Sequence, residues 1–378
     1  MPFIRTTTTS AAVLAVLWLT IALWAAPTKP VAKSDSKVPT EDLSPEVPAV
    51  PYLTLTLARD PSVHKELGLK PQQADNLFVA IAEVDEQFWQ LRDVPIAKCG
   101  VQLDALHSKL VDGLKRELTR SQLDRLNQII LQGRSWKALA SPDLAEKLKL
   151  TSDQVALLRI ALKDAIKERE STEKEIAGKS SSTQEQARSK LRESESRRFT
   201  AILKQHQQAD YRKLLGQSFD FSGVVQVGCV APELRQVTAW INSEPITLRQ
   251  LRGKVVVVHF WAFGCINCIR NLPHYQSWYE QFRDKGVMVV GIHTPETDSE
   301  KQIANLRRNV IERKIEYPVV FDAASENWKA WGNNMWPSVY LIDKQGRVRN
   351  WWYGELNWEG ANGEEFLRQR SAELRAEK

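Results

Sequence analysis

The sequence has 378 residues, of which 43% are hydrophobic, enough to bury more than one core. Its 52 basic and 46 acidic residues leave a formal net charge of +6, which is small for this length. This balance indicates a soluble chain with at most a mild attraction to anionic lipid, and it argues against a nucleic-acid partner.

The chain begins with an apolar segment. Arg5 and a Thr/Ser stretch precede residues 11–26, an almost unbroken apolar run that only Thr20 interrupts. The run is slightly shorter than the ~20 residues that span a bilayer and suits the hydrophobic region of a signal peptide. Leu23 or Trp24 would stand three residues before the cleavage site, where small residues are preferred, so cleavage is less evident than export. Residues 1–26 are therefore predicted to be a signal peptide or an uncleaved membrane anchor, with the remainder in the periplasm or cell envelope.

Residues 27–58 are predicted to be a proline-rich linker. Such a segment is semi-extended and buries too little apolar area to fold. It would hold the folded parts away from a membrane. Its prolines are Pro27, Pro30, Pro39, Pro45, Pro48 and Pro51.

A helical region follows, and an internal duplication divides it into two units, residues 59–140 and 141–220. Residues 118–122 and 150–154 both read LTxxQ, while residues 69–73 and 203–207 are degenerate copies. In this motif threonine caps a helix N-terminus, and the glutamine three residues later reaches back to the amide of the cap. The pattern predicts four helix N-termini.

Each unit is predicted to contain a long helix, a break, a second helix and a short third one. The long helices are expected over Gln72–Arg92 and Ser152–Ala177, and interleaved charges from Lys167 to Arg198 indicate a solvated hairpin. The apolar stripe expected to face inward on the second long helix contains Ala156, Leu157, Ile160, Ala161 and Ile166.

Paired LTxxQ motifs on a helical hairpin resemble the Spy and CpxP family of small envelope chaperones and stress proteins. That resemblance implies a region that recruits or orients a client, or one that spaces the remaining domain. LTxxQ is also simply a favourable helix start, and this second interpretation stays open.

Residues 221–378 contain a dithiol motif. The all-apolar run Val255–Val258 leads to Cys265 and Cys268, and a plausible helix follows. A CxxC at the junction of a buried strand and a helix is typical of a redox dithiol, because the helix N-terminus stabilises a thiolate. Cys265 is the candidate nucleophile and Cys268 its resolving partner.

A proline precedes a later strand of the same region. Pro337 stands directly before an apolar run, and further strands are expected over Val287–Ile292, Tyr317–Phe321 and Val348–Tyr353. Together with the strand–CxxC–helix pattern, this position suggests a cis-proline loop beside the dithiol. Such a loop would pair with the backbone of a substrate.

The segments FWAFGCINCIRNLP, VVGIHTPE and MWPSVYLIDKQGRV resemble thioredoxin-fold domains of the TlpA type, and in particular those of DipZ-type proteins. The resemblance implies an α/β thioredoxin-like domain after the all-α region. It also implies a thiol:disulfide oxidoreductase in an oxidising compartment, with Cys265, Cys268 and Pro337 at functional positions. His259 stands where many thioredoxins have a buried acid, and Trp336 stands where smaller residues are usual, so the direction of electron flow stays open.

Three neighbouring side chains have two interpretations each. His259 within an apolar strand fits a core histidine better than a proton relay, but both are considered. Trp261 and Trp336 either cover the core or contact a client beside the dithiol.

The other two cysteines, Cys99 and Cys229, are either a structural disulfide or free thiols. A zinc site is not expected, since structural zinc needs four ligands and the chain has no second CxxC. No cofactor is predicted.

The predicted function is disulfide exchange between the Cys265/Cys268 dithiol and client proteins, with the protein as reductant or isomerase rather than oxidant. The partners would be disulfide-containing or thiol proteins and a membrane electron donor or acceptor. The alternative is a client-binding scaffold in which the LTxxQ helices act and the dithiol is structural. A thiol peroxidase lacks support, because peroxidatic cysteines do not normally need an adjacent CxxC partner.

Overall fold

The computed structural model describes residues 50–225 and 227–377. The predicted signal or anchor segment, residues 1–26, and most of the predicted linker lie outside these residues. The linker prediction is wrong at its C-terminal end, because residues Val50–Ala58 form helix α1 and bury Leu55 and Leu57. Among the described helices, none combines the length and the hydropathy required to cross a bilayer.

The chain divides into two compact units, and the division differs from the predicted one. Unit 1 contains Leu53–Leu77 and Leu114–Gln226. Of the described residues, unit 2 contains 50–52, 78–113 and 227–377. A segment from the first predicted helical unit, residues 78–113, therefore belongs to the same compact unit as the dithiol.

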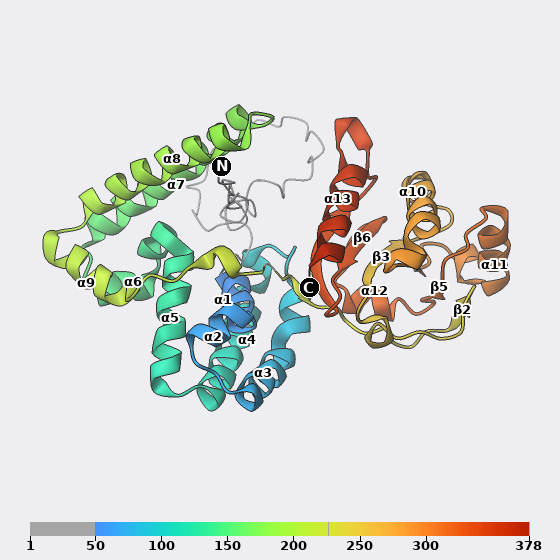
Figure 1. The fold of residues 1–378 in the computed structure, drawn as a ribbon, viewed down its shortest axis with the longest axis horizontal. Coiled ribbons are helices and arrows are strands. Elements are labelled where there is room, and N and C mark those ends of the chain that lie inside the picture. Colours follow the sequence, from blue (N-terminus) through green and yellow to red (C-terminus); the bar gives the residue numbers. More distant parts are fainter. Residues whose placement is uncertain (1–49, 226, 378) are drawn as a thin grey trace, which may run out of the picture. The chain divides into compact units, whose positions relative to one another are not determined.

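Helices and short connections make up the described residues from 50 to 215 (Figure 1). All four helix starts predicted from the LTxxQ copies are confirmed, at α3, α5, α7 and α9. Thr119 and Thr151 each form a capping box with the glutamine three residues later. After α1 the helices are α2 (Pro61–Glu66), α3 (Pro71–Gln90), α4 (Ile96–Glu117), α5 (Arg120–Arg134), α6 (Pro142–Lys147), α7 (Ser152–Ile176), α8 (Ser181–Ile202) and α9 (Gln205–Leu215).

The motif glutamines pair across each repeat of unit 1. Gln73 Nε2 donates to Gln122 Oε1 at 2.8 Å, and Gln154 Nε2 donates to Gln207 Oε1 at 2.7 Å. Each amide also donates to a backbone carbonyl next to the partner motif, as from Gln122 to Leu67 and from Gln207 to Leu148. Both repeats thus use the same contact, which gives the glutamine a second role beyond capping.

The hairpin of α7 and α8 buries a different face from the one expected. Leu158 and Ala165 are buried, whereas Leu157 and Ile160 are 52% and 56% exposed. The inward positions of α7 begin at Gln154 and recur every three or four residues, so the predicted stripe lies mostly on the solvent side. Ion pairs across the hairpin, such as Glu173 with Arg188 at 2.8 Å, agree with the predicted interleaving of charges.

A seven-stranded mixed sheet forms the C-terminal part of unit 2, with strand order β1-β7-β6-β3-β4-β5-β2. Its central strand β3 is parallel to β4 and antiparallel to β6. The predicted fold class is confirmed: an all-α helical region is followed by an α/β thioredoxin-like domain. The strands are β1 (Cys229–Val230), β2 (Ala239–Ile241), β3 (Val255–Trp261), β4 (Val287–His293), β5 (Val319–Phe321), β6 (Ser338–Ile342) and β7 (Arg347–Tyr353).

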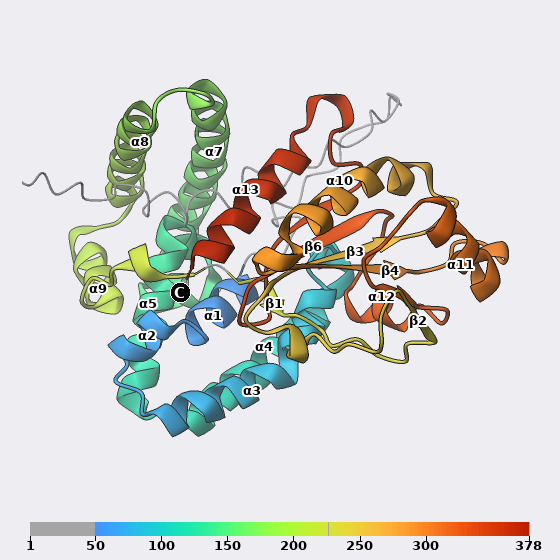
Figure 2. The same cartoon turned by 45° about the vertical axis from the view of Figure 1, so that its right-hand side comes forward.

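Alternate residues of β3 face two different cores. Val255 and Val257 pack with side chains of α10 (Ile266–Phe282), α11 (Ile303–Glu312) and α13 (Gly363–Ala376). Val256 and Val258 pack on the opposite face with Trp331, which follows α12 (Glu326–Ala330). Figure 2 shows α10 and α13 along one side of the sheet and α12 along the other. Because both faces are covered, every residue of β3 is buried.

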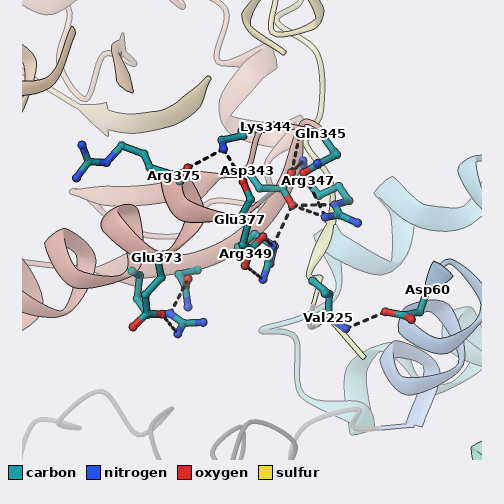
Figure 3. A network of polar contacts seen from close by, with 12 residues as sticks. Asp60, Val225, Asp343, Lys344, Gln345, Arg347, Arg349, Glu373, Arg375 and Glu377 are labelled. Carbon is teal, nitrogen blue, oxygen red and sulfur yellow. Dashed lines mark hydrogen bonds and ion pairs between the residues drawn. The ribbon is translucent and has the colours of Figure 1, made fainter. Parts of the chain in front are cut away.

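Polar contacts attach the end of α13 to the turn between β6 and β7 (Figure 3). Lys344 Nζ donates to the backbone carbonyls of Arg375 and Glu377 at 2.6 and 2.5 Å, which satisfies the exposed end of the helix. Arg349 joins the buried carboxylate of Asp343 at 3.2 Å to that of Glu377 at 2.7 Å. These contacts hold α13 on the face of the sheet that also carries α10.

Candidate active site

The dithiol lies where β3 gives way to α10. Cys265 is the N-cap residue of α10, and its Sγ accepts a hydrogen bond from the backbone N–H of Cys268 at 3.3 Å. The Cys268 thiol donates to Cys265 Sγ, with the two sulfurs 2.6 Å apart, and both cysteines are free. Cys265 is partly exposed, whereas Cys268 is only 1% exposed. The Cys265 side chain is therefore accessible to solvent, whereas that of Cys268 is buried behind it.

The two thiols differ in acidity. The hydrogen bond from the Cys268 thiol is the main cause that lowers the pKa of Cys265, and the backbone N–H groups at the helix start add to it. Burial, followed by the interaction with Cys265, raises the pKa of Cys268 far above its usual value. Cys265 is thus suited to be a thiolate nucleophile, and Cys268 stays protonated until Cys265 has formed a mixed disulfide.

A buried carboxylate that the sequence did not single out holds the loop before the dithiol. Glu300 is 1% exposed and accepts hydrogen bonds from the backbone N–H groups of Gly264 at 2.7 Å, Glu296 at 2.8 Å and Thr297 at 2.9 Å. Burial alone would raise the pKa of Glu300, but these N–H groups together hold it below its usual value. The carboxylate therefore connects the residue before Cys265 to the loop after β4.

Replacing Glu300 by glutamine is expected to loosen this connection, because an amide cannot accept from the same three donors as an ionised carboxylate. We expect the variant to lose about 1–3 kcal/mol of stability, the usual cost of leaving buried donors unpaired. The alkylation rate of Cys265 as a function of pH should also change, since the N–H groups around its sulfur are no longer fixed. Thr297→Val, which removes only one contact of Glu300, is the matched control. Unchanged stability and an unchanged alkylation profile would contradict this role of Glu300.

The proline loop lies beside the same end of β3. The Trp336–Pro337 peptide bond is cis, as the sequence predicted for this loop. Phe260 and Ser338 are register partners in β3 and β6, so Pro337 lies next to the segment that leads to Cys265. The Pro337 carbonyl accepts from the Gly354 N–H at 2.7 Å.

Trp336 is fixed at the start of this loop. Its Nε1–H donates to the carbonyl of Thr294 at 3.2 Å, and its ring stacks on Trp328 with the centroids 3.8 Å apart. Met335 next to it is 44% exposed, and Ile266, next to Cys265, is 57% exposed. Apolar side chains therefore meet solvent both on the proline loop and next to the nucleophile, although no motif identified them.

Trp261 and His259 lie in the core. Trp261 is fully buried, so its predicted contact with a client is not available, and the alternative of a core residue fits. His259 is also fully buried and stacks on Tyr275, with the ring centroids 4.1 Å apart. Among the described residues, neither ring nitrogen of His259 has a hydrogen-bond partner. Burial lowers the pKa of His259 to about 3, so its imidazole is neutral.

A second histidine shares this environment. His293 is fully buried at the end of β4 and stacks on Phe263, two residues before Cys265. Burial, more than the opposing charge of Glu300, sets the pKa of His293 at about 4. His293 belongs to the segment VVGIHTPE, and the structure places it against the dithiol loop.

Cys99 and Cys229 are both buried, and no disulfide joins them. The Cys99 Sγ donates to the carbonyl of Pro95, while Cys229 lies in the core on the α12 side of the sheet. The disulfide considered from the sequence is therefore not formed, and the structure has the free-thiol alternative. Even cysteine counts do not fix pairing, because a disulfide also requires close and correctly directed Cβ atoms.

A partly exposed thiol of lowered pKa, with a buried thiol behind it at a helix start, defines a redox site of the thioredoxin-like class. Residues 227–351 match the model of the AhpC/TSA family. Over 139 residues the chain is 30% identical to the thiol-disulfide oxidoreductase ResA of Bacillus thuringiensis, covering 37% of this chain and 76% of that protein. The chain belongs to the thiol-disulfide oxidoreductase family.

Two further similarities concern the same part of the chain. It is 43% identical over 128 residues to the protein DipZ of Mycobacterium tuberculosis, which covers 33% of this chain. The match spans only 18% of the DipZ protein. A crystal structure of a thiol-disulfide isomerase from Corynebacterium glutamicum shares 25% identity and a TM-score of 0.34, covering 39% of this chain and 98% of that chain.

Proposed function

We propose that this protein exchanges disulfides with client proteins through Cys265 and Cys268, and that it acts as a reductant or isomerase rather than as an oxidant. The observation that carries the proposal is the asymmetry of the dithiol. Cys265 is accessible and of lowered pKa, whereas Cys268 is buried and of raised pKa. This asymmetry suits attack on an incoming disulfide followed by release from behind.

In the proposed reaction, the Cys265 thiolate attacks one sulfur of a client disulfide. A new bond joins Cys265 to that sulfur, the client S–S bond breaks, and the other client sulfur leaves as a thiolate. Cys268 then passes its proton to the client thiolate already released and attacks Cys265 Sγ. The bond between Cys265 and the client breaks, the second client sulfur leaves as a thiolate, and Cys265 and Cys268 are joined in a disulfide. Two electrons have passed from the dithiol to the client.

The client strand would lie along the proline loop. Pro337 and the fixed Trp336 would hold its backbone beside Cys265, and exposed Met335 and Ile266 would contact its apolar side chains. His259 would keep the core behind Cys268 neutral. Its lowered pKa and its lack of partners among the described residues favour this role over a proton relay.

The cellular setting is part of the proposal. The apolar run at residues 11–26 supports export to the periplasm or cell envelope, with or without an anchor. A reductant in that compartment needs a supply of electrons, for which a membrane donor is the simplest source. The regions outside the family match would recruit clients or place the dithiol.

A scaffold role for the helices is the second candidate. The observation in its favour is the exposure of Leu157 and Ile160 on one side of α7, where an apolar client segment could bind. On this alternative the helices act on clients and the dithiol is structural.

The reduction potential of the dithiol tests the proposal. We would equilibrate the chain in thiol–disulfide buffers whose known potentials span both values below, and follow tryptophan fluorescence, because Trp261 packs in the same core as Cys265 and Cys268. A reductant should show a transition near or below the ~−270 mV of thioredoxin, whereas a value near the ~−120 mV of DsbA would identify an oxidant. The Cys265→Ser/Cys268→Ser variant is the control. A wild-type signal without any transition would count against a redox role and leave the scaffold.

A further inference from the structure

The end of α3 is buried in the second face of the sheet, although α3 precedes that sheet by more than a hundred residues. Trp89 is 1% exposed and belongs to the same core as Val258 and Phe260 of β3. Its ring lies 4.9 Å from that of Trp351, centroid to centroid. A Cβ at Gly228 would lie 2.6 Å from the Trp89 ring, so this close approach requires glycine. The last turn of α3 thus completes the core of unit 2.

Arg92 lies directly beyond that turn and is 5% exposed. Its guanidinium donates through Nε to Tyr353 Oη at 2.8 Å, through Nη1 to the Trp331 carbonyl at 2.8 Å, and through Nη2 to Tyr340 Oη at 2.9 Å. It also lies over the Trp89 ring, 4.1 Å from its centroid, and pairs with Asp93 at 3.4 Å. All three guanidinium nitrogens therefore have partners.

These partners surround one segment. The segment runs from Trp331, whose carbonyl Arg92 binds, to Tyr340 in β6, whose hydroxyl Arg92 binds. Trp336 and Pro337 lie within it. The Tyr340 hydroxyl also donates to Asn333 Oδ1 within the segment. Tyr353 is the register partner of Ser338, so its hydroxyl fixes the strand next to the loop.

A glycine makes room for this contact. Gly332 has a φ of +60°, and a Cβ there would lie 2.7 Å from Arg92 Nη1 and 2.9 Å from the Cα of Gln90. Gly332, near the start of the segment that carries the cis-proline, thus leaves space for Arg92 and for the end of α3.

We propose that Arg92 is a positioning residue for the cis-proline loop: it fixes residues 331–340 from the face opposite the dithiol core and so sets how tightly a client strand is held. The inference rests on the proposed function, because it concerns the same exchange reaction. Arginine suits the task since its planar fork reaches three acceptors in fixed directions, which the single ammonium of lysine cannot do. The segment 78–113 therefore takes part in client binding without touching the dithiol.

The test compares a protein disulfide with a small one. The full chain and its Arg92→Lys variant would be assayed for reduction of insulin and of 5,5′-dithiobis(2-nitrobenzoate), with kcat and KM determined for each. We expect KM for insulin to rise about tenfold, equivalent to one lost hydrogen bond to a charged group. We expect the rate with the small disulfide, which needs no strand pairing, to stay within about twofold of the wild-type rate. The reduction potential should not change measurably, because Arg92 does not contact the dithiol. Arg235→Lys is the matched control, because the Arg235 guanidinium binds Glu86 of α3 at 2.9 Å and its recorded polar partners among the described residues lie outside residues 331–340.

The assay results distinguish a failure of the role proposed for Arg92 from a failure of the proposed exchange reaction. An unchanged KM for insulin in Arg92→Lys would overturn the inference, and so would an equal loss of rate with both disulfides, which marks a general structural defect. If Arg92→Lys does not fold, Tyr340→Phe keeps the ring in the core and removes the hydroxyl that joins Arg92 to Asn333. The same selective rise in KM is expected there, and its absence would refute the inference. A wild-type chain that reduces neither disulfide would instead overturn the proposed function.

Discussion

Cys265→Ser is expected to lower insulin reduction to the rate of the dithiothreitol buffer alone, because a serine hydroxyl is not a nucleophile toward sulfur at neutral pH. Cys268→Ala should behave differently. Its Cys265 still attacks the client, but no buried thiol releases it, so a mixed disulfide accumulates. Turbidity of reduced insulin and non-reducing mass spectrometry measure the two results.

Cys99→Ser is the matched control, since Cys99 is a free, buried thiol of the same unit. It should retain the wild-type rate. Substantial exchange by Cys265→Ser would show that another thiol is the nucleophile. A Cys265→Ser chain that still binds clients and replaces the wild type in cells would support the scaffold role of the helices.

Acid is expected to destabilise unit 2 through its two buried histidines. The pKa of His259 is about 3 and that of His293 about 4, both below the value of 6.5 for an unperturbed histidine. Above pH 6.5 both histidines are neutral in the folded and in the unfolded chain, so neither one lowers the free energy of unfolding. As the pH falls from 6.5 towards 4, the unfolded chain binds protons that the folded chain cannot bind. Each histidine then removes up to about 1.4 kcal/mol of stability per pH unit.

Hydrogen exchange of the β3 and β4 amides between pH 4.5 and 7.5 measures this loss, since it reports the opening free energy of that region. His259→Leu should reduce the slope by up to about 1.4 kcal/mol per pH unit below pH 6.5. His206→Gln, which replaces an exposed histidine of α9, controls for the loss of an imidazole. Equal slopes in His259→Leu and wild type would show that His259 is accessible to protons in the folded chain.

The features that the sequence predicted correctly are local ones. The helix starts at Thr119 and Thr151 depend on a glutamine three residues away, and the dithiol depends on four consecutive residues after an apolar strand. The cis-proline loop was recognised from its neighbours in the same way. Within such short windows the backbone geometry and the residue types constrain each other.

The features that were missed depend on distant partners. Arg92 binds Tyr340 and Tyr353, 248 and 261 positions later, and Glu300 binds Gly264, 36 positions earlier. No spacing rule joins such residues. The stripe on α7 failed for a related reason, because both Leu157 and Leu158 are apolar and only the packed partner decides which of them is buried.

The division of the chain has a consequence for how it can be cut. Among the described residues, the chain passes between the two units four times: within α1, within α3, within α4 and at the junction of residues 226 and 227. A protease that cleaves only at the last crossing leaves the units covalently joined through these three helices. A gene fragment limited to the family match at residues 227–351 would lack both the segment that carries Trp89 and Arg92 and the final helix α13. A gene fragment that encodes the complete sheet core must therefore start in the helical region. The redox domain cannot be transferred to another protein as one contiguous segment.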